Sequence, residues 1–136
     1  MRLCKYCDTI YNLEKFIGIE VVDNSDDKLD TISILFRFEG DYLHSADEES
    51  TPYSFCVSIS THSLQIATRC EYKDIESAYE NSIHDILRGL ASEIVEIFGK
   101  KLEEMTTEDD YTIDIGDIKR DIMKTVAEVT RKENIK

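Results

Sequence analysis

The chain has 136 residues, of which 41% are hydrophobic and 33% are charged, and 29 acidic against 16 basic residues give it a net charge of −13. That balance is too apolar for a disordered chain and predicts one domain with one hydrophobic core. No apolar run approaches the roughly 20 residues of a membrane-spanning helix, and the negative charge disfavours direct binding to nucleic acid or to anionic lipid.

The first residues, MRLCKYCD, contain no apolar segment after their positive charge and no lipidation signal. We therefore expect no signal peptide and no membrane association, and a cytoplasmic location follows by default.

Residues 4–17 carry apolar side chains three or four residues apart, which predicts a short amphipathic helix. The end of this segment, residues 16–22, is equally compatible with a strand. Residues 23–27 read DNSDD, a run of side chains that bond their own backbone, and they predict a turn.

Three segments alternate between apolar and polar residues, which is the pattern of a half-buried strand. They cover residues 32–38, 53–59 and 64–72. The short link at residues 61–63 predicts that the last two strands form a hairpin.

From residue 75 to residue 102, apolar side chains recur in steps of three or four, which predicts one long helix beginning at about residue 74. Asp74 is the expected N-terminal cap. Gly89 and Gly99 lie inside this helix, and they suggest close packing or a bend.

A last helix is expected over residues 117–131, after a brief strand at residues 111–115. Its apolar stripe needs a partner, so we expect it to clamp onto the body of the chain or to join a subunit contact. Together the elements predict an α+β fold in one domain, residues 1–136. Its one-sided antiparallel sheet of three to five strands packs against the long helix, followed by the C-terminal helix.

Cys4 and Cys7 form a CxxC pair, but a zinc site needs further ligands at close spacing. Cys56 and Cys70 are too far apart in the chain to supply a second pair. A metal or redox role is thus the least favoured interpretation of the cysteines, behind a role as small apolar side chains. We expect no metal and no cofactor.

The acidic segment after residue 22 superficially resembles the sequence pattern of a calcium-binding loop. It does not match that pattern, because Lys28 stands where the loop needs glycine and Ile34 where it needs a bidentate acid. The histidines at positions 44, 62 and 84 form no HExxH pair, and no serine lies in a nucleophile elbow. We therefore expect a protein without enzymatic activity and assign no catalytic residue.

Acidic residues cluster in segments that are expected to be loops. They are either a solvated surface or a polyanion mimic that binds a basic partner protein, as an inhibitor or chaperone does. The candidate partner-binding residues are Asp41, Asp47, Glu48, Glu49, Glu103, Glu104, Glu108, Asp109 and Asp110.

The polar face of the predicted sheet offers a second hypothesis, a site for a phosphate-bearing ligand such as a nucleotide, on this face or at a subunit boundary. Its residues are Arg37, Arg69, Ser54, Ser58 and Gln65, with Ser33 and Ser60 on the same face. The alternative is that Glu39 and Glu71 neutralise the two arginines across strands. We expect a non-enzymatic, self-associating binding protein with a basic protein partner as the first hypothesis and the anionic ligand as the second.

Overall fold

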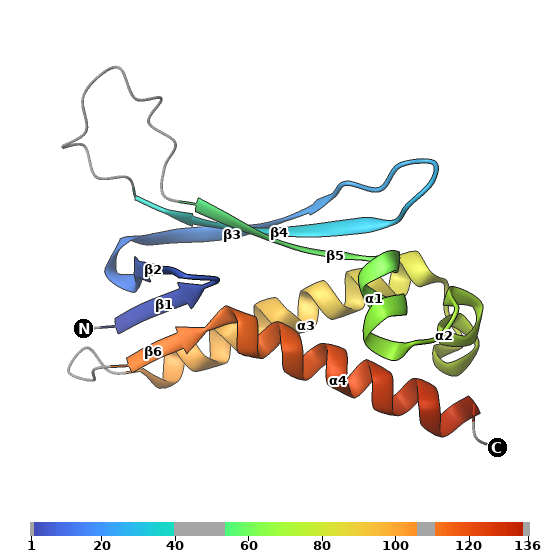
Figure 1. The fold of residues 1–136 in the computed structure, drawn as a ribbon. Coiled ribbons are helices and arrows are strands. Elements are labelled where there is room, and N and C mark those ends of the chain that lie inside the picture. Colours follow the sequence, from blue (N-terminus) through green and yellow to red (C-terminus); the bar gives the residue numbers. More distant parts are fainter. Residues whose placement is uncertain (1, 40–53, 106–110, 135–136) are drawn as a thin grey trace.

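The computed structural model of the chain describes residues 2–39, 54–105 and 111–134 (Figure 1). It has the predicted α+β fold. The strands are β1 (Arg2–Tyr6), β2 (Thr9–Asn12), β3 (Phe16–Asp23), β4 (Thr31–Phe38), β5 (Ser54–Ser60) and β6 (Tyr111–Asp114). The helices are α1 (Thr61–Thr68), α2 (Tyr72–Tyr79), α3 (Ile83–Glu104) and α4 (Ile115–Asn134), with a 3-10 turn at Leu13–Lys15.

The strands form two three-stranded sheets. The larger is antiparallel with the order β3-β4-β5, and the smaller has the order β2-β1-β6, in which β1 pairs antiparallel with β2 and parallel with β6. Within the described residues, the four helices and the small sheet lie on one side of the large sheet, and its other side carries no helix (Figure 1). The predicted one-sided sheet is therefore confirmed.

The strands predicted at residues 32–38 and 53–59 are confirmed as β4 and β5. Their alternation places the apolar residues against the helices, and these side chains are buried: Ile32, Ile34, Phe36, Phe38, Phe55, Val57 and Ile59. The register pairs Phe36 with Phe55 and Ile34 with Val57, so the two apolar rows form one continuous surface.

Aromatic rings join the layers. Phe55 stacks on Phe36 at 4.7 Å between centroids and also contacts Tyr6 and Tyr11 of the small sheet at 4.9 and 4.7 Å. Phe98 of α3 meets Phe36 edge-on at 5.2 Å. The core thus lies where α3 and the small sheet meet the large sheet.

The helix predicted at residues 4–17 is wrong, because this segment forms β1, β2, the 3-10 turn and the start of β3. Cys7 has a positive φ of 55° in the tight turn that pairs Tyr6 with Thr9. β1 also gains β6 as a parallel neighbour from the far end of the chain. Pairing across the chain thus overrides a local helical spacing. The alternative of a strand at residues 16–22 is confirmed.

The strand and hairpin predicted for residues 64–72 are also wrong. The Ser60 hydroxyl accepts a hydrogen bond from the Ser63 N–H at 3.1 Å and caps α1 at the end of β5. Leu64 and Thr68, one helical turn apart, are the buried residues of α1. The segment alternates between apolar and polar residues, but its buried residues, Leu64 and Thr68, follow the spacing of a helix.

The long helix predicted from residue 74 is two helices. Glu80, in the left-handed conformation, ends α2, and Ser82 caps α3, so Asp74 lies in the first turn of α2 and is not a cap. A Cβ atom added at Gly89 or Gly99 would meet nothing within 4 Å. The close packing suggested for these glycines is therefore wrong.

The C-terminal helix and the strand before it are confirmed as α4 and β6. α4 contacts α1, α2, α3 and β1, and it buries a stripe formed by Ile118, Ile122, Met123, Val126 and Ala127. It is a clamp on the body of its own chain and not a free basic arm. No helix among the described residues is long and apolar enough to cross a membrane.

The junction between α2 and α3 yields a stability prediction. Glu80 has φ 53° and ψ 41°, a conformation that glycine adopts without a steric penalty. We expect Glu80→Gly to raise the free energy of unfolding by up to about 1 kcal/mol and the β-branched control Glu80→Thr to lower it. Urea unfolding at constant m-value measures both changes, and a glycine variant less stable than wild type contradicts the prediction.

Candidate functional site

The acidic partner-binding residues are only partly within the described structure. Glu103 and Glu104 are exposed at the C-terminal end of α3. Asp41, Asp47, Glu48, Glu49, Glu108, Asp109 and Asp110 lie outside the described residues. A basic partner for this cluster stays a prediction.

The anionic-ligand face is not assembled as predicted. Arg37 and Ser54 are cross-strand partners at one end of β4 and β5, and Ser58 lies further along β5. Gln65 and Arg69 are on α1 and its C-cap, on the helix-covered side of the sheet (Figure 1), so placing them on a sheet face was wrong. Arg37 pairs with Glu20 of β3 and not with Glu39.

The CxxC cysteines do not converge. Cys4 is fully buried in β1, whereas Cys7 is exposed in the following turn. Burial, with a smaller effect of Asp114, raises the pKa of Cys4 to about 12, so this thiol stays protonated. Among the described residues, no three histidine, cysteine or acidic side chains are grouped in a way that would hold a metal ion.

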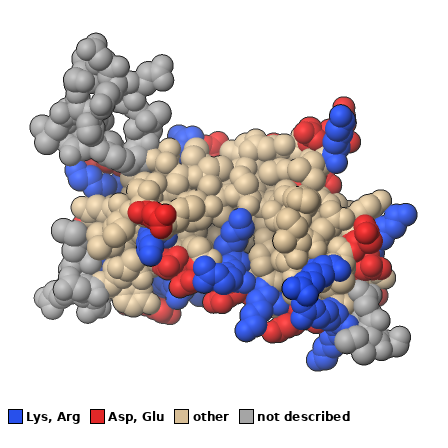
Figure 2. All heavy atoms as spheres, in the orientation of Figure 1, with Lys and Arg blue, Asp and Glu red and all other residues tan. Residues whose placement is uncertain are grey.

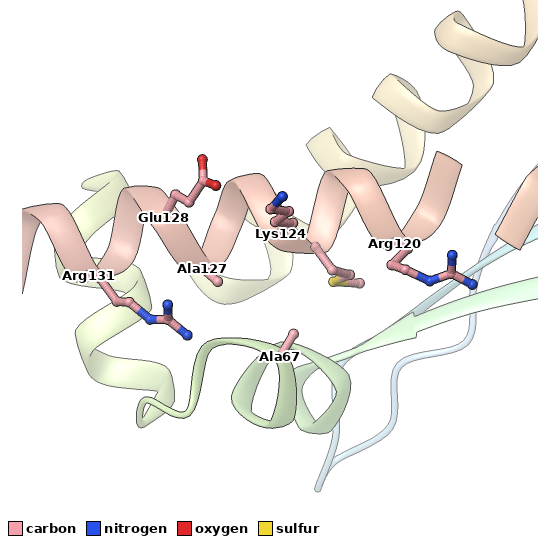
Figure 3. Close-up of a pocket in the computed structure, with 7 residues that line it drawn as sticks. Ala67, Arg120, Lys124, Ala127, Glu128 and Arg131 are labelled. Atoms are coloured by element: carbon pink, nitrogen blue, oxygen red, sulfur yellow. The ribbon is translucent and has the colours of Figure 1, made fainter. Parts of the chain in front are cut away.

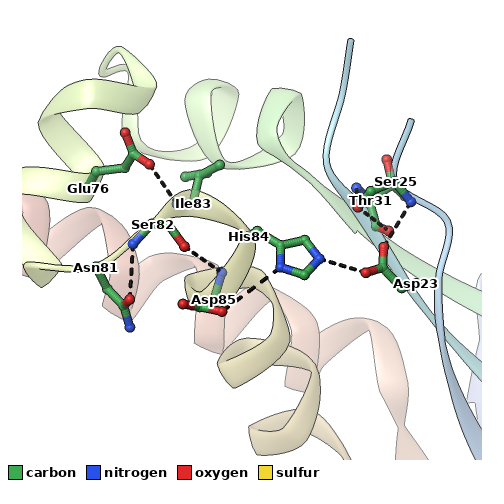
Figure 4. Close-up of polar contacts among 9 residues, drawn as sticks. All are labelled: Asp23, Ser25, Thr31, Glu76, Asn81, Ser82, Ile83, His84 and Asp85. Atoms are coloured by element: carbon green, nitrogen blue, oxygen red, sulfur yellow. Dashed lines mark hydrogen bonds and ion pairs between the residues drawn. The ribbon is translucent and has the colours of Figure 1, made fainter. Parts of the chain in front are cut away.

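A polar cluster links the start of α3 to the end of β3 (Figure 4). His84 Nε2 lies 2.6 Å from Asp23 Oδ2, and His84 Nδ1 lies 3.9 Å from Asp85 Oδ1. The Ser25 N–H donates to Asp23 Oδ1 at 2.9 Å. Hydrogen bonds from Ser25 and then from His84 hold the pKa of Asp23 well below its usual range.

This cluster has the composition of a catalytic triad but not its geometry. Both ring nitrogens of His84 face carboxylates, and neither faces a hydroxyl. Ser82 accepts a hydrogen bond from the Asp85 N–H, and Glu76 accepts one from the Ile83 N–H. These side chains cap the free N–H groups of α3. The cluster therefore fastens α3 to the sheet.

A groove lies between α1 and α4. It has a volume of about 380 Å³. Its lining residues are Ala67 of α1 and Arg120, Met123, Lys124, Ala127, Glu128 and Arg131 of α4. In Figure 3, Ala67 and Ala127 point toward each other across the groove, with Arg120 and Arg131 toward its two ends.

The groove combines an apolar floor with a positive rim. Three cations against the single carboxylate of Glu128 leave its lining with a net charge of +2, on a chain whose net charge is −13. Figure 2 shows lysine and arginine side chains gathered along α4. Arg120 pairs with Asp117 at 2.7 Å, but its side chain is 76% exposed, so the pair is weak and Arg120 stays accessible.

The packing of two helices positions these groups. Ala67 and Ala127 are small enough for α1 and α4 to approach, while Met123 is nearly buried beneath them. Because Arg120, Lys124 and Arg131 are four and seven residues apart, they follow one side of α4. The sequence shows a basic C-terminal segment. The groove also needs α1, and the sequence analysis had predicted a strand in place of that helix.

Comparison of the chain with protein-family models, curated proteins and solved structures finds no match.

The Asp23 cluster predicts a pH-dependent stability. Because the folded-state pKa of Asp23 is lowered, its contribution is present above the unfolded-state pKa of about 4 and is lost as the pH falls below it. We expect Asp23→Asn to be less stable than wild type at pH 7 and this difference to shrink below pH 4. Urea unfolding at both pH values, with Asp27→Asn in the same turn as a control, tests this. A constant difference contradicts it.

The cysteine arrangement predicts selective labelling. Iodoacetamide should modify the exposed Cys7 and Cys56 of the native protein, while Cys4 reacts only after unfolding, because it is buried and its pKa is about 12. Peptide mass spectrometry measures each site, with and without added zinc. Equal labelling of Cys4 and Cys7 would contradict the burial of Cys4, and protection of Cys7 by zinc would revive the metal interpretation.

Proposed function

We propose that this protein is a non-enzymatic binding protein whose groove between α1 and α4 takes an acidic, amphipathic segment of a partner protein. The observation that carries the proposal is the positive rim around an apolar floor on a strongly acidic chain. Charge complementarity favours acidic side chains at the rim, and the floor favours apolar side chains between them.

The length of the groove supports a polypeptide over a small ion. Arg120 and Arg131 are eleven residues apart on α4, which corresponds to about 16 Å along the helix axis. A single phosphate spans only a fraction of that distance. A helix of three turns matches it and presents a polar and an apolar side at once.

The floor also argues against a nucleotide. Ala67, Met123 and Ala127 give a base no aromatic ring to stack on. An aliphatic floor instead suits leucine or methionine side chains of a docked helix. The phosphate-bearing ligand is therefore less well supported than an acidic segment.

A second candidate is the basic partner of the acidic loops. The net charge of −13 supports it, as do the exposed carboxylates of Glu103 and Glu104 at the end of α3. The two modes demand partners of opposite charge, so one measurement distinguishes them.

The experiment uses a labelled helical peptide with glutamates at positions 1, 5 and 12 and leucines on the same face. We expect saturable binding by fluorescence anisotropy, weakened at least about tenfold by Lys124→Glu, because that change reverses the central charge of the rim. The matched control is Lys100→Glu, which makes the same change at an exposed position of α3 that does not line the groove.

Two results would contradict the proposal that the groove binds an acidic segment. One is absence of saturable binding of the acidic peptide. The other is equal weakening by the two lysine variants. Binding of a peptide in which lysines replace the glutamates, unchanged by Lys124→Glu, would favour the second candidate.

A further inference from the structure

β3 is an edge strand with an unpaired side. In the described part of the chain it pairs only with β4, whereas the opposite edge of the sheet is partly blocked. There the Lys119 ammonium donates to the Ser58 carbonyl oxygen of β5 at 3.0 Å. An eight-residue strand with a free edge is a template for another strand.

The hydrogen-bond pattern shows which backbone groups of β3 are free. The Asn24 N–H donates to the Thr31 carbonyl at 2.9 Å, so this backbone group points toward β4. The direction of the backbone N–H and C=O groups alternates from residue to residue along an antiparallel strand, so those of Val22 and Glu20 also point toward β4. The N–H and C=O groups of Ile19, Val21 and Asp23 therefore point to the free side.

Apolar side chains accompany these free groups. Val21 is 48% exposed and Ile17 is 62% exposed, although both belong to a strand of the main sheet. The register of β3 against β4 shifts between Phe16 and Gly18, so a regular edge begins only after this bulge.

We propose that a second copy of this chain pairs with β3 antiparallel about a two-fold axis at Val21, joining two large sheets into one of six strands. In this register Val21 faces Val21 of the second copy, and Ile19 of each chain faces Asp23 of the other. Each of these pairs brings together residues whose backbone groups point outward, so about six hydrogen bonds form. The same surface serves both copies, as closed symmetry requires.

Two neighbouring registers of the pairing between two copies of β3 are less favourable. An axis at Glu20 would set two carboxylates directly opposite each other, which is repulsive. An axis at Ile19 would pair Val21 with Ile17, which the bulge removes from the regular ladder. Of the registers centred on Ile19, Glu20 and Val21, the edge therefore favours the one centred on Val21.

The acidic residues of β3 do not oppose this pairing. Glu20 is already paired with Arg37 of β4, and Asp23 is held by Ser25 and His84. Both carboxylates therefore have partners inside their own chain. Pairing through β3 is also independent of the groove between α1 and α4.

The first test is Val21→Pro, which removes an outward N–H and costs no hydrogen bond among the described residues. We expect the wild-type protein to sediment as a dimer at micromolar concentration and Val21→Pro to sediment as a monomer. The matched control is Cys56→Pro. Its N–H also points outward, because it lies two residues before Ser58, but it is on the opposite edge, so the dimer should persist.

The second test is a cross-link, which does not depend on how well the proline variants fold. Val21→Cys, with Cys7, Cys56 and Cys70 replaced by serine, should form a disulfide-linked dimer on mild oxidation, because facing residues in such a ladder have Cα atoms about 5.5 Å apart. Lys28→Cys in the same background should not. A monomeric wild type, a dimer that survives Val21→Pro, or equal cross-linking of the two cysteine variants would overturn the proposal.

Discussion

The rest of the structure depends on the contact between Phe55 and the rings around it. Phe55 stacks on Phe36 within the large sheet and meets Tyr6 and Tyr11 of the small sheet, while Phe98 of α3 packs against Phe36. Aromatic rings from distant parts of the sequence thereby join three layers, and aromatic side chains bury a large area per residue. This cluster supplies part of the apolar surface that the two sheets and α3 bury against one another.

This packing on one side explains where the binding surfaces lie. The described helices and the small sheet cover a single face of the large sheet, β4 is the one neighbour of β3 among the described strands, and α4 packs against α1 (Figure 1). The buried stripe of α4 holds it to the body, and its remaining cations form the rim of the groove. Met123 and Ala127 belong both to this buried stripe and to the floor of the groove, so the cations of the rim lie beside residues that hold α4 in place.

The breaks between elements come from short polar side chains and from left-handed residues. Ser60 and Ser82 cap α1 and α3, and Arg69 and Glu80 adopt the left-handed conformation that ends α1 and α2. Each break redirects the chain, and together they turn an apparent strand and one long helix into three helices. The polar cluster of Asp23 and His84 then fixes the start of α3 to the sheet.

The sequence by itself determined the α+β class, the strands β4 and β5, and the helix α4, because each has a strong apolar period that one buried face imposes. Tertiary structure decided β1, β2, α1 and the division at Glu80. Those segments are short, and parallel pairing with β6, side-chain caps and a left-handed residue outweigh their weak local preferences. The acidic character was legible in composition, but the groove was not, because α1 and α4 meet only when the chain has folded around its aromatic core.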